Sequence, residues 1–106
     1  MDADHLKRRT KAFSLRILKL VGALPNDVQG RAIGSQLERD QEPNLLPKSE
    51  VVEEEADESA FWMELIVESE ILREKKVTAL HLEAKELVAI MARSRITAAK
   101  HVKRKP

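Results

Sequence analysis

The sequence predicts an all-α protein, folded as one antiparallel up-down four-helix bundle over residues 1–106. Apolar residues recur every three or four positions through long segments, which is the pattern of an amphipathic helix. Three glycines, four prolines and no tyrosine leave little material for strands and hairpin turns. The chain is 42% hydrophobic and 35% charged, a composition that suits a folded helical domain better than a disordered one.

The first helix is expected over residues 4–24 and the second over residues 27–39. One stripe of the first helix carries Leu6, Phe13, Ile17, Leu20 and Leu24, widened by Leu18 and Val21. Pro25 ends this helix, and Asn26 or Asp27 can cap the next. The second helix places Val28, Ala32, Ile33 and Leu37 on one side. Gly30 and Gly34 weaken it, each by up to ~1 kcal/mol relative to alanine, and their spacing also suits a close helix contact.

A loop is predicted over residues 40–48, because Pro43 and Pro47 disfavour helix at the preceding residues. The third helix follows over residues 49–74, with Ser49 as its N-cap. Its inward stripe is expected to be Val52, Ala56, Ser59, Met63, Ile66 or Val67, and then Glu70 or Ile71. The fourth helix, over residues 78–102, has the stripe Leu80, Ala84, Leu87, Met91, Ser94, Ala98 and Val102. The predicted core residues are Phe13, Ile17, Leu20, Met63, Leu87 and Met91.

The sequence offers no catalytic constellation. His5, His81 and His101 have no metal-ligand spacing, the serines have no nucleophile-elbow context, and no Gly-rich phosphate loop is present. Glu53, Glu54 and Glu55 are consecutive, so they fan around a helix rather than converge. We therefore expect no catalytic residues, no cofactor, no metal site and no small-molecule substrate, and we expect that the protein is not an enzyme.

The location expected from the sequence is the cytoplasm. The chain contains no cysteine, which excludes disulfides and thiolate chemistry and fits a reducing compartment. No apolar run approaches the ~20 residues of a membrane span, and the charged first residues lack the apolar region of a signal peptide.

Charge is segregated along the chain, with basic first and last segments around an acidic middle. One interpretation is that these charges solvate helix faces and pair across neighbouring helices. The other is a basic face for RNA or DNA backbone, formed if the first and last helices lie side by side. Its candidate residues are Arg8, Arg9, Lys11, Arg16, Arg93, Lys100, Lys103 and Arg104.

Residues 60–67 contain seven apolar residues in eight, enough to cover nearly every direction around two helical turns. A helix on the outside of a small bundle should keep roughly half of its surface polar. The excess predicts a homo-oligomer interface anchored by Phe61, Trp62, Leu65 and Ile66, because exposed apolar and aromatic patches usually mark protein contacts. The alternative is an unusually deep core.

Four segments in order are AFSLRILKLVGALP, IGSQLER, EEADESAFWMELIVES and EAKELVAIMARSRITAAK. Together they resemble the four helix bundle protein family of 23S rRNA-intervening sequence proteins. The resemblance runs from about Ala12 to Lys100, apart from the middle loop. It implies a bacterial, left-handed up-down bundle that assembles into a ring, usually a homopentamer, with no established molecular function.

A related bundle, the accessory variability determinant of diversity-generating retroelements, is a basic pentamer that binds nucleic acid and a reverse transcriptase. This analogy adds to the nucleic-acid hypothesis. The chain departs from the family at DQEPNLLPKSEVV, where it is shorter by roughly sixteen residues, about four helical turns. The resemblance is therefore to a divergent or internally shortened member, in which the second helix and its connection are reduced.

Overall fold

The computed structural model describes residues 3–42 and 52–103, with side-chain environments for 4–42 and 54–93. This part of the chain contains four α-helices and no strand, which confirms the all-α class. They are α1 (Ala3–Ala23), α2 (Val28–Asp40), α4 (Val52–Glu68) and α5 (Glu74–Lys103). No helix among the described residues is both long and apolar enough to cross a membrane.

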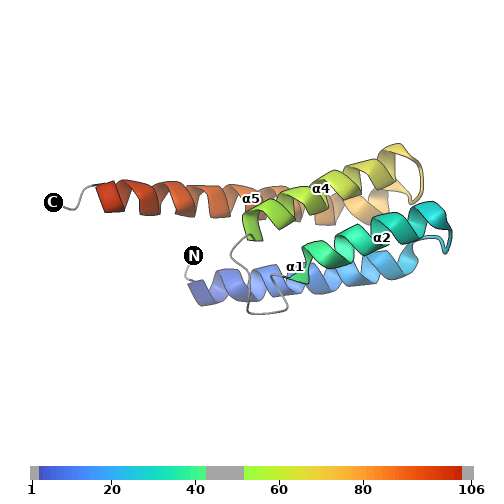
Figure 1. Cartoon of the computed structure of the whole chain (residues 1–106), viewed down its shortest axis with the longest axis horizontal. Coiled ribbons are helices and arrows are strands. Elements are labelled where there is room, and N and C mark those ends of the chain that lie inside the picture. The colour runs from blue at the N-terminus through green and yellow to red at the C-terminus, as the bar shows by residue number, and fades with distance from the viewer. Residues whose placement is uncertain (1–2, 43–51, 104–106) are drawn as a thin grey trace.

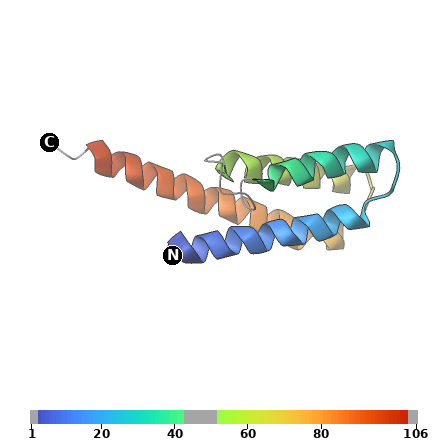
Figure 2. The same cartoon turned by 60° about the horizontal axis from the view of Figure 1, so that its bottom comes forward.

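The four helices form a closed ring of neighbours, in which α1 contacts α2, α2 contacts α4, α4 contacts α5, and α5 contacts α1. Consecutive helices run in opposite directions, so the α1–α2 and α4–α5 connections lie at the same end of the molecule (Figure 1). The 30-residue α5 extends beyond the other helices at the opposite end (Figure 2). This overhang contributes to an elongated molecule of 57 × 24 × 20 Å.

All four helices contribute to one hydrophobic core. Its largest fully buried apolar side chains are Phe13, Ile17, Leu37, Met63, Ile66, Val77 and Leu87. Five of the six residues predicted for the core are buried, and the sixth, Met91, is partly buried and packs against the cluster. The described residues of the α1, α4 and α5 stripes thus face inward as their spacing predicts, whereas the side chains of Val52, Ser94, Ala98 and Val102 lie outside the described residues. The prediction of the inward stripe on α2 was partly wrong, because Val28 is 74% exposed and Ala32 is also exposed.

The start of α2 has the expected cap. Asp27 has an extended backbone, and its Oδ1 accepts a hydrogen bond of 2.7 Å from the Gly30 backbone N–H. Gly30 is needed here because a Cβ at this position would lie 1.9 Å from the Pro25 carbonyl oxygen. Gly34 approaches α1 more loosely, since its nearest neighbour would be a Val21 methyl group at 3.2 Å. Gly30 is thus in close contact within the α1–α2 turn, and Gly34 is in contact across the α1–α2 helix pair.

The boundary between the last two helices differs from the prediction. α4 ends at Glu68 rather than at residue 74, and α5 begins at Glu74 rather than at residue 78. Glu70 has φ 59°, the Glu70 N–H donates to the Val67 carbonyl, and the Ile71 N–H donates to the Ile66 carbonyl. This is the Schellman arrangement that closes a helix C-terminus, formed here without glycine.

The predicted 40–48 loop also begins too early, because Asp40 is the last residue of α2. Most of that loop and the proposed Ser49 cap fall within residues 43–51, which lie outside the described residues.

Candidate functional site

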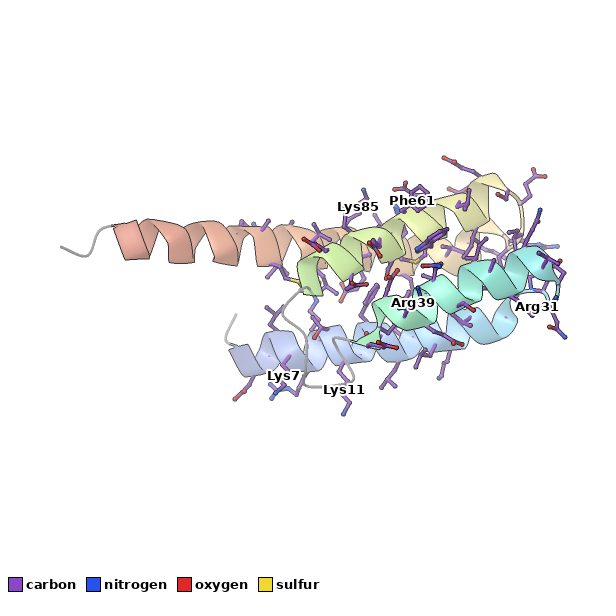
Figure 3. The ribbon with its side chains drawn as sticks, in the orientation of Figure 1. Lys7, Lys11, Arg31, Arg39, Phe61 and Lys85 are labelled. Atoms are coloured by element: carbon purple, nitrogen blue, oxygen red, sulfur yellow. The ribbon has the colours of Figure 1, made fainter. Side chains whose placement is uncertain are left out.

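An apolar patch lies on the outer side of α4. Phe61 is 55% exposed, and its ring meets the Trp62 ring edge-to-face at a centroid distance of 5.0 Å. Leu65, one helical turn after Phe61, is partly buried, as is Trp62. We call Phe61, Trp62 and Leu65 the α4 patch. In Figure 3, Phe61 lies at the edge of the molecule opposite Lys7 and Lys11 of α1.

Ile66 does not belong to this patch, although the sequence placed it among the interface anchors. Its side chain is fully buried in the core beside Met63 and is inaccessible to another protein. The helical period explains the difference, because Ile66 follows Met63 by three residues and therefore shares its inward face. The apolar run of α4 is thus divided between the core and the surface.

A second apolar feature is a groove between α4 and α5, of about 200 Å³. Its lining includes Val67, Val77 and Leu82, and Leu82 is 62% exposed. His81 on the groove donates through Nε2 to Glu64 Oε1 at 2.8 Å, and this hydrogen bond is the main reason that the pKa of Glu64 is lowered. The histidine therefore joins two helices at the groove wall.

The basic residues of α1 differ in exposure and in pairing. Lys7, Arg8, Lys11, Arg16 and Lys19 are exposed, and we call them the α1 basic face. Arg9 instead turns toward α5, where its Nε and Nη2 donate to Glu83 at 2.8 and 2.7 Å and Nη2 also lies 2.9 Å from Glu86 Oε1. The hydrogen bonds from Arg9 lower the pKa of Glu83.

The first and last helices thus do lie side by side, but Arg9 is paired across their contact rather than presented to a ligand. Arg93 is exposed on α5. The side chains of the other three candidates, Lys100, Lys103 and Arg104, lie outside the described residues.

A buried polar layer crosses the bundle at the end of α2. Ser14 Oγ donates to Gln41 Oε1 at 2.8 Å, and Gln41 Nε2 donates to Ser59 Oγ at 3.0 Å and to the Leu37 carbonyl at 2.9 Å. Ser59 Oγ in turn donates to the Glu55 carbonyl at 2.9 Å. Ser14, Gln41 and Ser59 are all fully buried. This layer links α1 and α4 through the residue that follows α2.

Beside the polar layer, Asp40 of α2 meets Glu55 and Glu58 of α4. Asp40 is 2% exposed, and its pKa is raised to about 9, first by burial and then by its contacts with the two glutamates and their like charge. The sequence prediction missed this cluster because Asp40 was assigned to a loop and the glutamates to a solvated face. The spacing of three between Glu55 and Glu58 places them on one side of a helix, but nothing in the sequence indicates that Asp40 lies opposite.

Comparisons of the chain with protein-family models, with curated proteins and with solved structures found no match. The resemblance to the 23S rRNA-intervening sequence family therefore rests on the quoted segments alone and stays a prediction.

Proposed function

We propose that this protein is a non-enzymatic helical-bundle protein of the cytoplasm that self-associates through the α4 patch. The observation that carries the proposal is the exposure of Phe61 at 55% beside the partly buried Trp62 and Leu65. Burial of apolar surface contributes about 25 cal/mol for each Å², and aromatic side chains concentrate this gain at the centre of interfaces. A second protomer would remove this surface from water.

The geometry also supports a ring-like assembly, for which the family resemblance predicts a homopentamer. A ring requires each protomer to offer two different surfaces, because its interface is head-to-tail. The α4 patch and the apolar groove at Leu82 are two such surfaces on one chain. We propose that the α4 patch of one protomer packs against the groove of the next.

Native mass spectrometry and light scattering at several concentrations test the assembly. We expect wild type to form one discrete oligomer and Phe61→Glu to be a monomer with unchanged helical content by circular dichroism. Leu15→Glu is the matched control, because Leu15 is 50% exposed but lies on α1, and it should assemble as wild type does. A wild-type chain that stays monomeric at high concentration contradicts the proposal.

Leu82→Glu separates the two interface geometries. If the patch packs against the groove, Leu82→Glu also prevents assembly, and mixing it with Phe61→Glu restores one intact contact and yields a heterodimer. If two patches pack against each other about a two-fold axis, Leu82→Glu assembles normally. The second result would leave self-association in place and exclude the ring.

As a second function we propose binding of RNA or DNA backbone by the α1 basic face. The observation in favour is that Lys7, Arg8, Lys11, Arg16 and Lys19 are all exposed on one helix. Phosphate contacts made by such side chains release counterions, so affinity should fall steeply as salt rises. Lys7 and Lys11 of this face lie away from Phe61 in Figure 3.

Filter binding of single- and double-stranded probes across a salt series tests this function. Lys11→Gln/Arg16→Gln should weaken binding and reduce the salt dependence by about two phosphate contacts. Lys75→Gln/Lys76→Gln removes two exposed cations from the start of α5 and should have a smaller effect. No binding at low salt, or binding indifferent to salt, contradicts the hypothesis.

A further inference from the structure

Three carboxyl groups from two helices converge at the C-terminal end of α2. Asp40, Glu55 and Glu58 each offer one oxygen, and these oxygens lie within 4.8 Å of one another. The group has graded exposure, because Asp40 is buried, Glu55 is half-buried and Glu58 is exposed. No ion pair found within the described residues involves any of the three. None of the three carboxyl groups is therefore paired with a lysine or arginine side chain in that part of the chain.

Asp40 also carries a buried oxygen atom without a hydrogen-bond partner in the described part of the chain. Its Oδ2 is the one buried side-chain polar atom, among the described residues, that has no hydrogen-bond partner. Leaving such a group buried and unpaired costs about 1–3 kcal/mol, and more when it is charged. The carboxyl faces those of Glu55 and Glu58, so the unpaired oxygen belongs to a side chain that is turned into the cluster.

The position of Asp40 at the end of α2 further disfavours the ionised form of its carboxyl group. It is the last residue of α2, where the backbone carbonyls give the helix end a partial negative charge. A carboxylate is disfavoured at this end, whereas a cation is favoured. The helix end and the three carboxyl groups therefore both favour the binding of a cation.

We propose that Asp40, Glu55 and Glu58 bind a hard divalent cation, with Ca²⁺ as the best-fitting ion. Oxygen-only ligand sets select hard cations. Ca²⁺ binds oxygens at about 2.3–2.6 Å, so ligands on opposite sides of the ion are up to about 5 Å apart, compared with about 4.2 Å around Mg²⁺. Three carboxylates whose oxygens lie within 4.8 Å of one another suit the flexible coordination of Ca²⁺ better than that of Mg²⁺, which is usually bound through only one or two carboxylates. Exposed Glu58 gives the ion a route from solvent, and water would complete the coordination.

The polar layer holds the ligands in place. Gln41 immediately follows Asp40 and is hydrogen-bonded to Ser14 and Ser59, which fixes the end of α2 between α1 and α4. Ser59 also donates to the backbone carbonyl of Glu55 within α4, so the layer is joined to the helical turn that carries the second ligand. Such outer contacts orient ligands before the ion arrives and reduce the cost of binding.

Thermal unfolding in chelator and in CaCl₂ tests the site. For a dissociation constant near 0.1 mM, about 10 mM CaCl₂ should raise the Tm of wild type by at least about 5 °C relative to EDTA at matched ionic strength. Glu55→Gln/Glu58→Gln should lose most of this rise. Glu54→Gln/Asp57→Asn is the matched control, because it removes two exposed acids from the same helix outside the cluster, and it should keep the full rise.

Terbium luminescence locates the ion independently of stability. Trp62 is the only tryptophan of a chain that lacks tyrosine, and it lies one helical turn after Glu58. Tb³⁺ at the site should therefore emit when tryptophan is excited, and CaCl₂ should displace it. Trp62→Phe should abolish the emission but keep the CaCl₂-induced rise in Tm.

Three results would overturn the proposal. The first is no change in Tm and no sensitised emission for wild type. The second is an equal rise in Tm for wild type and Glu55→Gln/Glu58→Gln, which would show nonspecific screening. The third is Tb³⁺ emission that survives in Asp40→Asn and in the double glutamine variant, which would place the ion elsewhere.

Discussion

Asp40→Asn should make the stability of the metal-free protein much less dependent on pH. The substitution keeps the shape of the side chain and removes its ability to ionise. In the folded protein the pKa of Asp40 is raised to about 9, whereas an unfolded chain has an aspartate pKa near 3.9. Between these values the folded state retains a proton that the unfolded state has released.

The sign of the effect follows from this difference. The stability associated with the raised pKa is fully present below about pH 4 and is lost as the pH rises toward 9. One proton corresponds to at most about 1.4 kcal/mol for each pH unit, so the free energy of unfolding of wild type should fall by up to about 3 kcal/mol from pH 6 to pH 8. Asp40→Asn should lack this decrease and should be the more stable protein at pH 8.

Urea unfolding followed by circular dichroism at pH 6, 7 and 8, in EDTA, measures the effect. Asp57→Asn is the control, because Asp57 is exposed on α4, and it should follow wild type at all three values. The reasoning is refuted if Asp40→Asn shows the same decrease as wild type. It is also refuted if wild type is equally stable at pH 6 and pH 8.

Three further predictions concern stability. Gly30→Ala should destabilise the fold by at least about 2 kcal/mol, since its Cβ would collide with the Pro25 carbonyl, although alanine is otherwise the better helix former. Glu70→Gly should raise the free energy of unfolding by about 1 kcal/mol, because glycine adopts the left-handed conformation without strain. Arg9→Met should cost about 1–2 kcal/mol at pH 7, and the loss should shrink as the pH falls through the lowered pKa of Glu83.

Urea titrations of matched variants check these values. Gly22→Ala should be stabilising by up to about 1 kcal/mol, since nothing lies within 4 Å of its added Cβ, and a loss equal to that of Gly30→Ala would contradict the steric argument. Arg8→Met should change stability by less than about 0.5 kcal/mol, because Arg8 is exposed. A Glu70→Gly variant that unfolds more easily than wild type would show that the side chain of Glu70 matters more than its backbone.

Helix periodicity was sufficient to predict the class and most of the core, because each stripe depends only on local spacing. The end of α4 could not be predicted in the same way. Ile71 and Leu72 continue the apolar pattern through the turn and pack against the core, so the sequence shows no interruption there. Glycine or proline normally marks such a turn, but Glu70 forms it instead.

The candidate sites depended more on tertiary contacts. The pairing of Arg9 with Glu83 was not predicted, because both Arg9 and the buried Thr10 stand in the seven-residue gap between Leu6 and Phe13. The exposure of Phe61 followed from the excess of apolar residues in α4. The meeting of Asp40 with Glu55 was inaccessible, because it depends on where α2 ends relative to a helix that begins twelve residues later.

The buried layer of Ser14, Gln41 and Ser59 has a consequence for how uniquely the helices align. Leucine and isoleucine pack acceptably after a helix slides by one turn, but these hydrogen bonds do not survive such a shift. Any misaligned bundle would lose the Ser14–Gln41 and Gln41–Ser59 hydrogen bonds, at a cost of about 1–3 kcal/mol for a buried polar group left without a partner. Gln41 therefore favours the one alignment of α1, α2 and α4 in which its side-chain amide reaches both Ser14 and Ser59.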